Sequence, residues 1–428
     1  MKRRQFVQTL AAGSALGSLG LMTGCATPAG GGSGPHVVVI GGGYGGATAA
    51  KYTRMFSEGK VRVTLIEPNA NFISCPISNL VIGGLKDISY ITTSYENLEK
   101  RHGVRIVRDM ATAIDPDKRL VKLAGGGEVA YDRLIVSPGI DFMWETLPGM
   151  AKEGAKDKVL HAWKAGPQTV ALRKQLEAMP DGGVYALSIP LMPYRCPPGP
   201  YERACIVAHY FKKAKPKSKV IVFDANDDVT SKPALFKKAW EEHYKDIIEY
   251  RPKHNVVDVD AATNTLKFEF NEDFKAAVLN VVPNMRAGDI AVKSGMATAN
   301  ARWCEVDFLT FESKALKNVH VLGDSIQIAP AMPKSGHMAN QHGKTCAAAV
   351  VNLLMGHQPP QLPLYANTCY SFVNDEDVVH VASVHRYDPE QKTMLTVPGS
   401  GGVSAAANAL EGRYALAWAQ NIWADMLA

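Results

Sequence analysis

His36-Val-Val-Val-Ile40 runs directly into Gly41-Gly-Gly-Tyr-Gly-Gly46, and this stretch decides the fold. The first five residues form a short apolar run of the kind found in a buried parallel strand. The glycines follow at once, and an Ala-containing segment after them predicts a helix over residues 47–56. Strand, glycine turn and helix in this order are typical of the first half of a Rossmann-type βαβ unit.

The glycines also have the spacing of a dinucleotide-binding turn. Gly41, Gly43 and Gly46 occupy the G-x-G-x-x-G positions, where missing side chains permit a tight turn and close approach to a pyrophosphate. A second strand is expected over residues 61–66. It ends at Glu67, about 20 residues after the last glycine, in the right place to accept from a ribose hydroxyl. A glycine turn with a purely structural role is the alternative.

Two later strands indicate which dinucleotide is bound. Residues 131–139 close on a Pro-Gly turn and resemble the strand that ends the first segment of the FAD domain in two-dinucleotide-domain flavoproteins. Residues 319–324 form an apolar strand that delivers Gly323 and Asp324, and in that superfamily this Asp holds the ribityl or phosphate end of the flavin. A simple Gly-Asp turn is the alternative. FAD is therefore expected, rather than NAD, at the first nucleotide site.

The segment between these landmarks predicts a second α/β domain that lacks a nucleotide site. We expect strands over residues 184–189 and 219–223 and a helix over residues 201–211. The turn after the first strand, residues 190–200, contains five prolines. Proline has no backbone N–H, so this turn cannot form an amide cradle for a pyrophosphate. Electrons must then come from a donor other than NAD(P)H.

Composition indicates an ordinary soluble protein and argues against a nucleic-acid partner. The chain has 428 residues, of which 46% are hydrophobic and 21% charged, as in ordinary soluble proteins of two or three domains. The formal charge of +6 comes partly from Lys2, Arg3 and Arg4; without them 44 basic residues face 41 acidic ones. Because no basic block follows, nucleic acid is not an expected partner.

The N-terminus predicts export to the periplasm. Arg3-Arg4 followed by Phe6 resembles a twin-arginine signal, and a general secretory signal is the alternative. The apolar stretch after it is too short and too polar to span a bilayer. Cys25 stands in an approximate lipoprotein box, so a lipid anchor is possible, and residues 29–34 form a Gly-rich tether.

Two of the seven cysteines lie in segments that point to a family. Cys196 lies in the proline-rich turn and Cys369 near the start of the C-terminal extension. The chain resembles the flavoprotein subunit of flavocytochrome c sulfide dehydrogenase, a relative of sulfide:quinone reductases. The resemblance spans the mature chain, and its most specific segments are residues 196–203, 303–307, 310–313 and 333–336.

The resemblance implies roles for three cysteines. Those matching Cys196 and Cys369 form a redox disulfide over the flavin, which hydrosulfide attacks by thiol–disulfide exchange; an inert structural disulfide is the alternative. The cysteine matching Cys75 carries a thioether to the flavin, and a third redox cysteine is the alternative. Cys205 and Cys304 have no clear role, and Cys346 is expected in the core.

Four further residues are candidates for roles near the flavin. Glu202 is a candidate base, with a solvated helix carboxylate as the alternative. Lys334 precedes a helix and is predicted to stabilise the anionic edge of reduced flavin. His337 and Trp418 are candidates to line a route from the flavin to an external acceptor, although His337 stands where an aromatic residue is expected.

We therefore predict an α/β chain with two Rossmann-like domains of the disulfide-reductase type and a C-terminal α+β extension. The signal and tether occupy residues 1–34, and the FAD domain consists of residues 35–144 and 281–358. The second domain covers residues 145–280 and the extension residues 359–428.

The predicted reaction is oxidation of sulfide, with electrons passing to a c-type cytochrome subunit. The chain has no Cys-x-x-Cys-His, so haem c must belong to that partner. The rival predictions are a sulfide:quinone reductase and a non-catalytic flavoprotein partner of a sulfur-oxidising complex.

Overall fold

The computed structural model describes residues 34–428, so the predicted signal, Cys25 and nearly all of the tether lie outside the described residues. The first sheet has five parallel strands in the order β19-β9-β1-β2-β5. These strands are β1 (His36–Ile40), β2 (Arg62–Ile66), β5 (Arg105–Val107), β9 (Arg133–Val136) and β19 (Val319–Val321). The interior residues of β1 are fully buried, as an apolar parallel strand requires.

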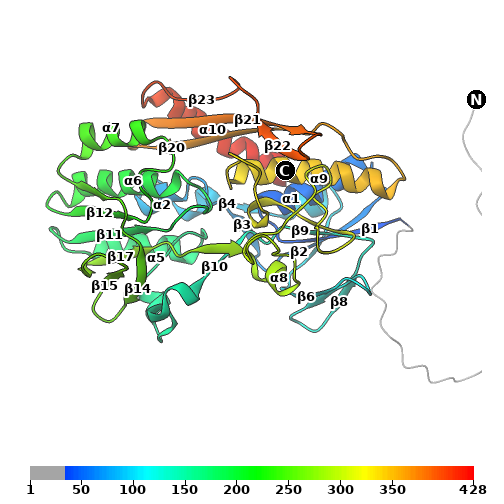
Figure 1. Cartoon of the computed structure of the whole chain (residues 1–428), viewed down its shortest axis with the longest axis horizontal. Helices are drawn as coiled ribbons and strands as arrows, with labels where there is room; N and C mark the ends of the chain where they lie inside the picture. The colour runs from blue at the N-terminus through cyan, green and yellow to red at the C-terminus, as the bar shows by residue number, and fades with distance from the viewer. Residues whose placement is uncertain (1–33) are drawn as a thin grey trace, which may run out of the picture. The chain divides into compact units, whose positions relative to one another are not determined.

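Two helices pack together on one face of this sheet (Figure 1). Helix α1 (Tyr44–Phe56) follows β1 directly, and α9 (Gly336–Leu354) lies at the end of the second segment of the predicted FAD domain. They approach closely because glycines meet: a Cβ on Gly343 would lie 2.6 Å from the carbonyl oxygen of Gly45. Residues nearly 300 positions apart in the sequence therefore form one layer.

The second sheet has four parallel strands in the order β13-β12-β11-β17. These strands are β11 (Val184–Ile189), β12 (Lys219–Asp224), β13 (Ile248–Arg251) and β17 (Val278–Val281), with helices α5 (Pro167–Ala178), α6 (Gly199–Ala214) and α7 (Pro233–Tyr244) around them. The strand expected over residues 184–189 is confirmed, and the helix after the proline turn begins at Gly199 with a proline in its first turn.

The C-terminal part is an antiparallel sheet with a closing helix. Its elements are β20 (Leu364–Phe372), β21 (Val378–Asp388), β22 (Thr393–Thr396), β23 (Gly402–Val403) and α10 (Ala409–Leu427). In Figure 1 the long strands β20 and β21 run across the upper part of the molecule, from beside α7 toward α9. Strand β20 contacts both α6 and α9, so it connects the two Rossmann-like parts.

Smaller elements complete the chain. They are β3 (Asn71–Ile73), α2 (Ser78–Ile82), β4 (Thr92–Ser94), α3 (Glu96–Lys100), β6 (Ala111–Asp115), β7 (Leu120–Leu123), β8 (Glu128–Ala130), β10 (Ile140–Phe142), α4 (Ala155–Lys158), β14 (Val256–Asp260), β15 (Thr265–Phe268), β16 (Phe274–Lys275), β18 (Met285–Ala287), α8 (Asp289–Lys293) and four 3₁₀ turns, η1 (Ile88–Ile91), η2 (Trp144–Thr146), η3 (Pro148–Ala151) and η4 (Gly323–Ser325). The predicted α/β class with two Rossmann-like domains is confirmed.

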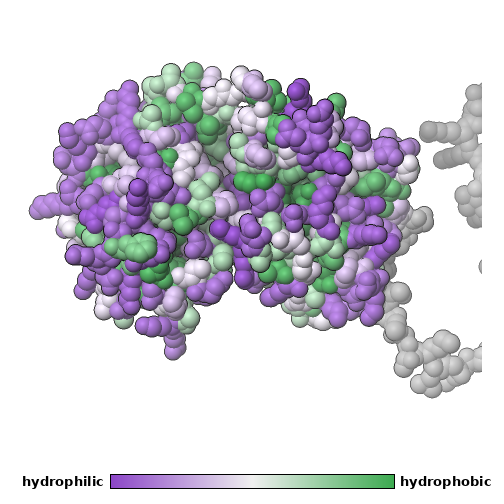
Figure 2. Space-filling view, viewed as in Figure 1, coloured by the Kyte–Doolittle hydropathy of each residue, from purple (hydrophilic) through white to green (hydrophobic). Residues whose placement is uncertain are grey.

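Hydrophilic residues cover most of the face seen in Figure 2, and apolar residues appear there in small separate groups. Within residues 34–428, every helix is too short or too polar to pass through a bilayer.

Candidate functional site

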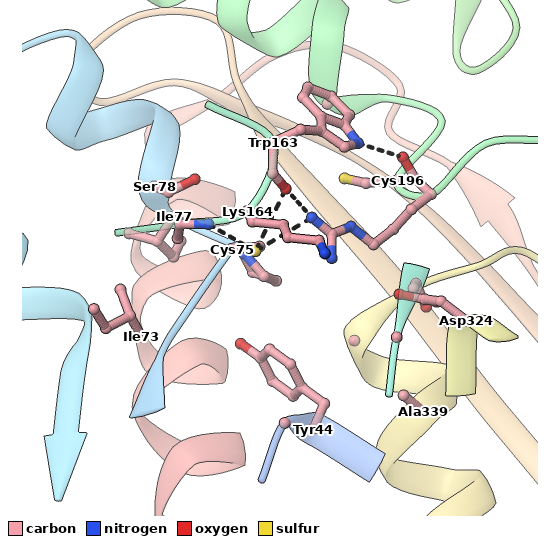
Figure 3. A pocket seen from close by; sticks show the side chains of 18 of the residues that line it. Tyr44, Ile73, Cys75, Ile77, Ser78, Trp163, Lys164, Cys196, Asp324 and Ala339 are labelled. Atoms are coloured by element: carbon pink, nitrogen blue, oxygen red, sulfur yellow. Dashed lines mark hydrogen bonds between the residues drawn. The ribbon is translucent and has the colours of Figure 1, made fainter. Parts of the chain in front are cut away.

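A cavity of about 420 Å³ lies where the two Rossmann-like parts and the C-terminal sheet meet (Figure 3). Its volume is within the range of pockets for small molecules and cofactors. The glycine turn, the loop after β3, the loop before α6, the start of α9 and strand β20 all line it. Most residues predicted for the site are therefore brought to one place.

The glycine turn fits a pyrophosphate. Gly41 has φ +93°, and a Cβ there would lie 2.4 Å from the carbonyl oxygen of Ser137. A Cβ on Gly46 would lie 1.8 Å from the carbonyl oxygen of Gly41. By contrast, a Cβ on Gly43 meets no protein atom within 4 Å, so this glycine opens onto the cavity. The backbone at Gly43 and the N-terminus of α1 thus face the space where an anion would lie.

Glu67 is held rigidly beside this turn. The residue is 7% exposed. One carboxylate oxygen accepts from the Gly42 N–H at 2.7 Å, and the other accepts from the Asn69 N–H at 2.8 Å and from Asn69 Nδ2 at 2.7 Å. A carboxylate accepts about four hydrogen bonds, so capacity remains for a ribose hydroxyl. This donor and acceptor set fits the dinucleotide that the sequence predicts.

Gly323 and Asp324 also line the cavity, from η4 at the end of β19. Burial raises the pKa of Asp324, and the charges of Arg195 and Lys334 oppose that shift. An acid in this position can accept from the polar chain of a flavin.

Lys334 is placed differently from our prediction, because it does not line the cavity. Its ammonium donates to the carbonyl oxygens of Asp324 at 2.9 Å and Ile326 at 2.6 Å, and it lies 3.6 Å from the ring centroid of Trp303. These hydrogen bonds hold the Lys334 side chain outside the cavity lining. The cap of α9, Ser335, faces the cavity instead.

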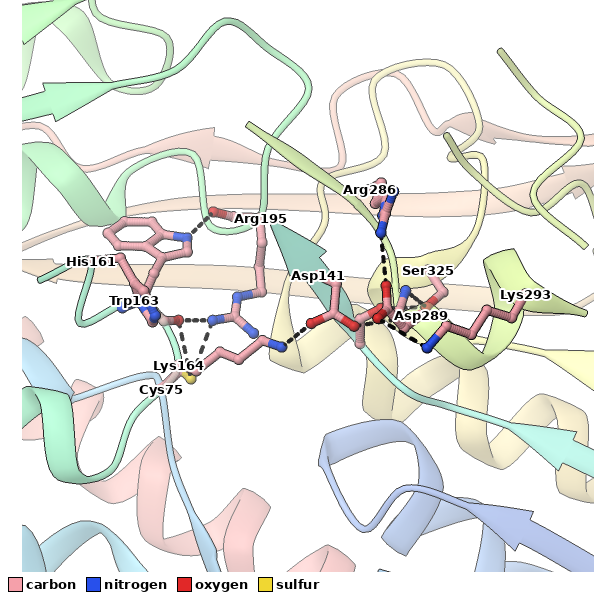
Figure 4. A network of polar contacts seen from close by, with 12 residues as sticks. Cys75, Asp141, His161, Trp163, Lys164, Arg195, Arg286, Asp289, Lys293 and Ser325 are labelled. Atoms are coloured by element: carbon pink, nitrogen blue, oxygen red, sulfur yellow. Dashed lines mark hydrogen bonds and ion pairs between the residues drawn. The ribbon is translucent and has the colours of Figure 1, made fainter. Parts of the chain in front are cut away.

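Cys75 lies on the loop after β3, and its sulfur faces two N–H donors. The Ala165 N–H points to Sγ at 3.3 Å and Arg195 Nη2 lies 3.5 Å from it. Figure 4 shows that Arg195 also donates to the Trp163 carbonyl oxygen. Cys75 is thus held at the cavity wall by the Ala165 N–H and by Arg195, the residue that precedes Cys196.

A polar network fixes this wall (Figure 4). Lys164 forms an ion pair with Asp141, which accepts from the Asp289 N–H at 2.8 Å. Asp289 in turn accepts from Arg286 at 2.9 Å. The network ties the loop that carries Trp163 and Lys164 to β10 and to the start of α8.

Cys196 and Cys369 line the same cavity although they are 173 positions apart. Cys196 is in the left-handed region, with φ +58°, and its N–H donates to the Lys334 carbonyl oxygen at 2.9 Å. Cys369 lies within β20, opposite Val381. Both are free thiols in the structure, and burial raises the pKa of each. Their pairing as a redox disulfide stays a prediction.

Glu202 lies in the first turn of α6 and is not solvated: it is 8% exposed. One oxygen accepts from the Phe372 N–H at 2.9 Å and the other from Asn79 Nδ2 at 2.8 Å. Burial raises the pKa of this carboxyl above its usual 4.5. It is therefore a buried, hydrogen-bonded carboxyl that joins the second domain to the end of β20.

The sequence analysis missed two buried cations near the cysteines. Arg203 is 2% exposed and donates to Asn79 Oδ1 and Asn280 Oδ1, both at 2.9 Å. It ends the motif of residues 196–203, so the motif itself was a signal. Lys232 is 5% exposed and reaches β20 from the loop before α7, and nothing in its surrounding sequence indicated this.

His337 and Trp418 both line the cavity, with ring centroids 5.7 Å apart. The His337 Nδ1 accepts from the Thr368 N–H at 3.0 Å, which fixes the ring. Their role in electron transfer stays a prediction. Cys205 and Cys304 are buried, and the core position predicted for Cys346 is confirmed.

Three segments of this chain match known protein families. Residues 169–283 match the central part of the flavoprotein chain of sulfide dehydrogenase (flavocytochrome c). Residues 361–427 match the flavin-binding part of flavocytochrome c sulphide dehydrogenase. Residues 35–178 match pyridine nucleotide-disulphide oxidoreductases.

Individual relatives agree with these matches. The mitochondrial sulfide:quinone oxidoreductase of Mus musculus is 28% identical over 323 residues, covering 72% of this chain and 69% of that protein. The sulfide dehydrogenase (flavocytochrome c) flavoprotein chain of Chlorobaculum thiosulfatiphilum is 53% identical over 46 residues, covering 11% of this chain and 94% of that sequence.

Among solved structures, the sulfide:quinone oxidoreductase of Aquifex aeolicus shares the fold, with a TM-score of 0.73 and 18% identity. The alignment covers 92% of this chain and 91% of that one. Together with the flavin-binding segments matched above, these results show that the chain belongs to the family of flavocytochrome c sulfide dehydrogenase flavoprotein chains, a sulfide-oxidising flavoprotein family related to the sulfide:quinone oxidoreductases.

Proposed function

We propose that this chain is a periplasmic, FAD-dependent sulfide dehydrogenase that passes electrons to a c-type cytochrome subunit. The observation that carries the proposal is the meeting of Cys196 and Cys369 in one cavity with the dinucleotide turn and Glu67. Export is supported by Arg3 and Arg4 in the N-terminal sequence.

The sulfur chemistry follows from thiol–disulfide exchange between these two cysteines. Hydrosulfide attacks one sulfur of the oxidised pair, so the S–S bond breaks, a persulfide forms on that cysteine and a thiolate is left on the other. A second hydrosulfide removes the outer sulfur of the persulfide as HSS⁻ and leaves a thiol. The pair has then gained two electrons, and oxidation of the dithiol closes the disulfide again.

FAD bound in the cavity would supply the two-electron acceptor for that oxidation and release the electrons singly. Gly43 and Glu67 would hold its dinucleotide end, and Asp324 its ribityl or phosphate end. Glu202 is buried near both cysteines, and its charge acts on each of them. Its carboxylate form can take the proton of the incoming sulfur species.

A quinone is the second candidate for the electron acceptor. The relatives from mouse and Aquifex aeolicus are named as sulfide:quinone oxidoreductases, whereas the relative from Chlorobaculum thiosulfatiphilum is named as a flavocytochrome c chain. The 53% identity to the latter and the two flavocytochrome c domain matches favour the cytochrome.

The acceptor is tested by mixing purified holoprotein with sulfide and either a c-type cytochrome or a soluble quinone analogue. We expect sulfide to bleach the flavin absorbance and cytochrome c to restore it. Bleaching that only the quinone reverses would overturn the cytochrome assignment. Absence of bleaching by sulfide would overturn the sulfide dehydrogenase assignment as a whole.

Replacing Cys75 with serine should make the flavin extractable by acid. If Cys75 forms a thioether to FAD, acid precipitation of the wild-type protein leaves the yellow colour in the pellet, whereas in Cys75→Ser all the colour moves to the supernatant. Cys346→Ala, which removes a core thiol remote from the cavity, serves as the control and should keep the colour in the pellet. Wild-type colour in the supernatant would show that the flavin is not covalently bound.

A further inference from the structure

Lys232 is a buried cation for which the chemistry above has no use. It directly precedes α7 in the left-handed region, with φ +55°, and is 5% exposed. Its ammonium donates to the carbonyl oxygen of Cys369 at 3.1 Å, to Ser371 Oγ at 2.8 Å and to the carbonyl oxygen of Val379 at 3.3 Å. All three acceptors are on β20 or β21, so a residue of the second domain is anchored in the C-terminal sheet.

These three acceptors are neutral, so they satisfy the N–H groups but do not balance the charge. Burying a charge is costly unless an opposite charge compensates it. A left-handed backbone at a residue other than glycine adds a further cost. Glu202 supplies one opposite charge, and the hydrogen bond to the Cys369 carbonyl oxygen places the ammonium beside a second group that can become an anion, the Cys369 sulfur.

The ionisable groups that face Lys232 come from four parts of the chain. They are Cys369 of β20, Glu202 of α6, Cys196 of the loop before α6 and Glu411 of α10, all of which raise its pKa, while burial lowers it to about 8. On the helix that follows, the ring centroid of Phe236 lies 5.5 Å from the ammonium. The lysine therefore carries its charge at neutral pH.

The charged groups and hydrogen-bond donors near Cys369 differ from those near Cys196. Besides Lys232, Asn367 Nδ2 lies 3.4 Å from the sulfur of Cys369, and both lower its pKa. Glu202 raises the pKa of both thiols, and the pKa of Cys196 is raised further by Cys369, with Arg195 as its opposing cation. An anionic sulfur is thus better stabilised at Cys369 than at Cys196.

We propose that Lys232 is a positioning residue that stabilises anionic sulfur at Cys369. This inference rests on the proposed function in one respect, namely that hydrosulfide is the anion drawn to this end of the cavity. In the reduced pair the negative charge is then held at Cys369, beside the cation, rather than at Cys196.

The test measures the anion directly and needs neither sulfide nor an electron acceptor. Reduced holoprotein is alkylated with iodoacetamide between pH 6 and 10, and the rate at Cys369 is read by mass spectrometry of its peptide. Lys232 lowers the pKa of the Cys369 thiol, and removing a nearby cation raises a thiol pKa by about one unit or more. We therefore expect Lys232→Met to slow alkylation of Cys369 at pH 7 by roughly tenfold.

Lys232→Arg keeps the charge and should recover most of the rate, which a merely structural role of the residue would not explain. Above pH 8 Lys232 of the wild type loses its proton, so the difference between wild type and Lys232→Met should shrink. Lys213→Met, which removes an exposed lysine of α6, is the matched control and should leave the rate unchanged.

An unchanged or faster rate at Cys369 in Lys232→Met would overturn the inference. So would equal slowing in Lys232→Met and Lys232→Arg, because both would then reflect altered packing. If the methionine variant does not fold, Lys232→Gln replaces it with the same expectations. Failure of the wild type to react with sulfide would contradict the proposed function and leave the alkylation result standing.

Discussion

Cys369→Ser is expected to abolish sulfide-dependent reduction of cytochrome c, with a loss of at least about 10³-fold in kcat/KM. A serine oxygen cannot form the disulfide that hydrosulfide attacks, nor can it carry a persulfide. Serine has nearly the same shape as cysteine, and Cys369 lies within β20 at the edge of the cavity. We therefore expect the variant to keep the fold and the bound flavin. Stopped-flow measurement of cytochrome reduction at 550 nm reports the rate.

Cys196→Ser should have the same effect, because each cysteine needs the other, and the double variant should lose no more activity than either single one. Cys346→Ala is again the control. Full activity in either single variant would mean that the two cysteines are not the redox pair and that sulfide reduces the flavin without them.

Gly46→Ala is expected to prevent formation of the dinucleotide turn. Its Cβ would lie 1.8 Å from the Gly41 carbonyl oxygen, a contact that only a shift of the backbone can relieve. Because α1 also packs against α9, the shift spreads to both helices, and we expect a loss of stability above about 4 kcal/mol. Urea unfolding followed by circular dichroism measures this loss, and the ratio of absorbance at 450 and 280 nm measures bound flavin.

Gly43→Ala is the matched variant, since its Cβ meets no protein atom within 4 Å. Its unfolding midpoint should stay near that of the wild type without flavin, while its flavin content falls because the methyl group enters the space reserved for the pyrophosphate. Normal flavin content in Gly43→Ala would contradict the placement of the dinucleotide at this turn.

The local elements of the first sheet could be predicted from sequence because their signals are local. Strand β1 has the predicted limits His36–Ile40. Helix α1 was expected from residue 47 but begins at Tyr44. Its first turn contains two glycines, which disfavour a helix in isolation, so the sequence did not indicate this turn. Packing against α9 holds these glycines in the helix.

The site could be predicted only where a motif carried it. Gly43, Glu67 and Asp324 line one cavity as the βαβ pattern and the Gly-Asp strand end indicated. The hydrogen bonds of Lys334 could not be predicted, because the carbonyl oxygens that hold its ammonium belong to residues eight and ten positions earlier; its role at the reduced flavin stays a prediction. Lys232 escaped prediction because only the packing of α7 against the C-terminal sheet brings it to Cys369.

The placement of Cys369 on β20 has a consequence for how the protein is made. A ribosome completes the glycine turn and Cys196 long before it adds β20, so a growing chain holds Cys196 without Cys369. The two cysteines that we propose as the redox pair meet only when β20 docks across α6 and α9. If the proposed function holds, the chain acquires its sulfide chemistry late in synthesis, and a product truncated before β20 would bear the nucleotide fold yet stay inert toward sulfide.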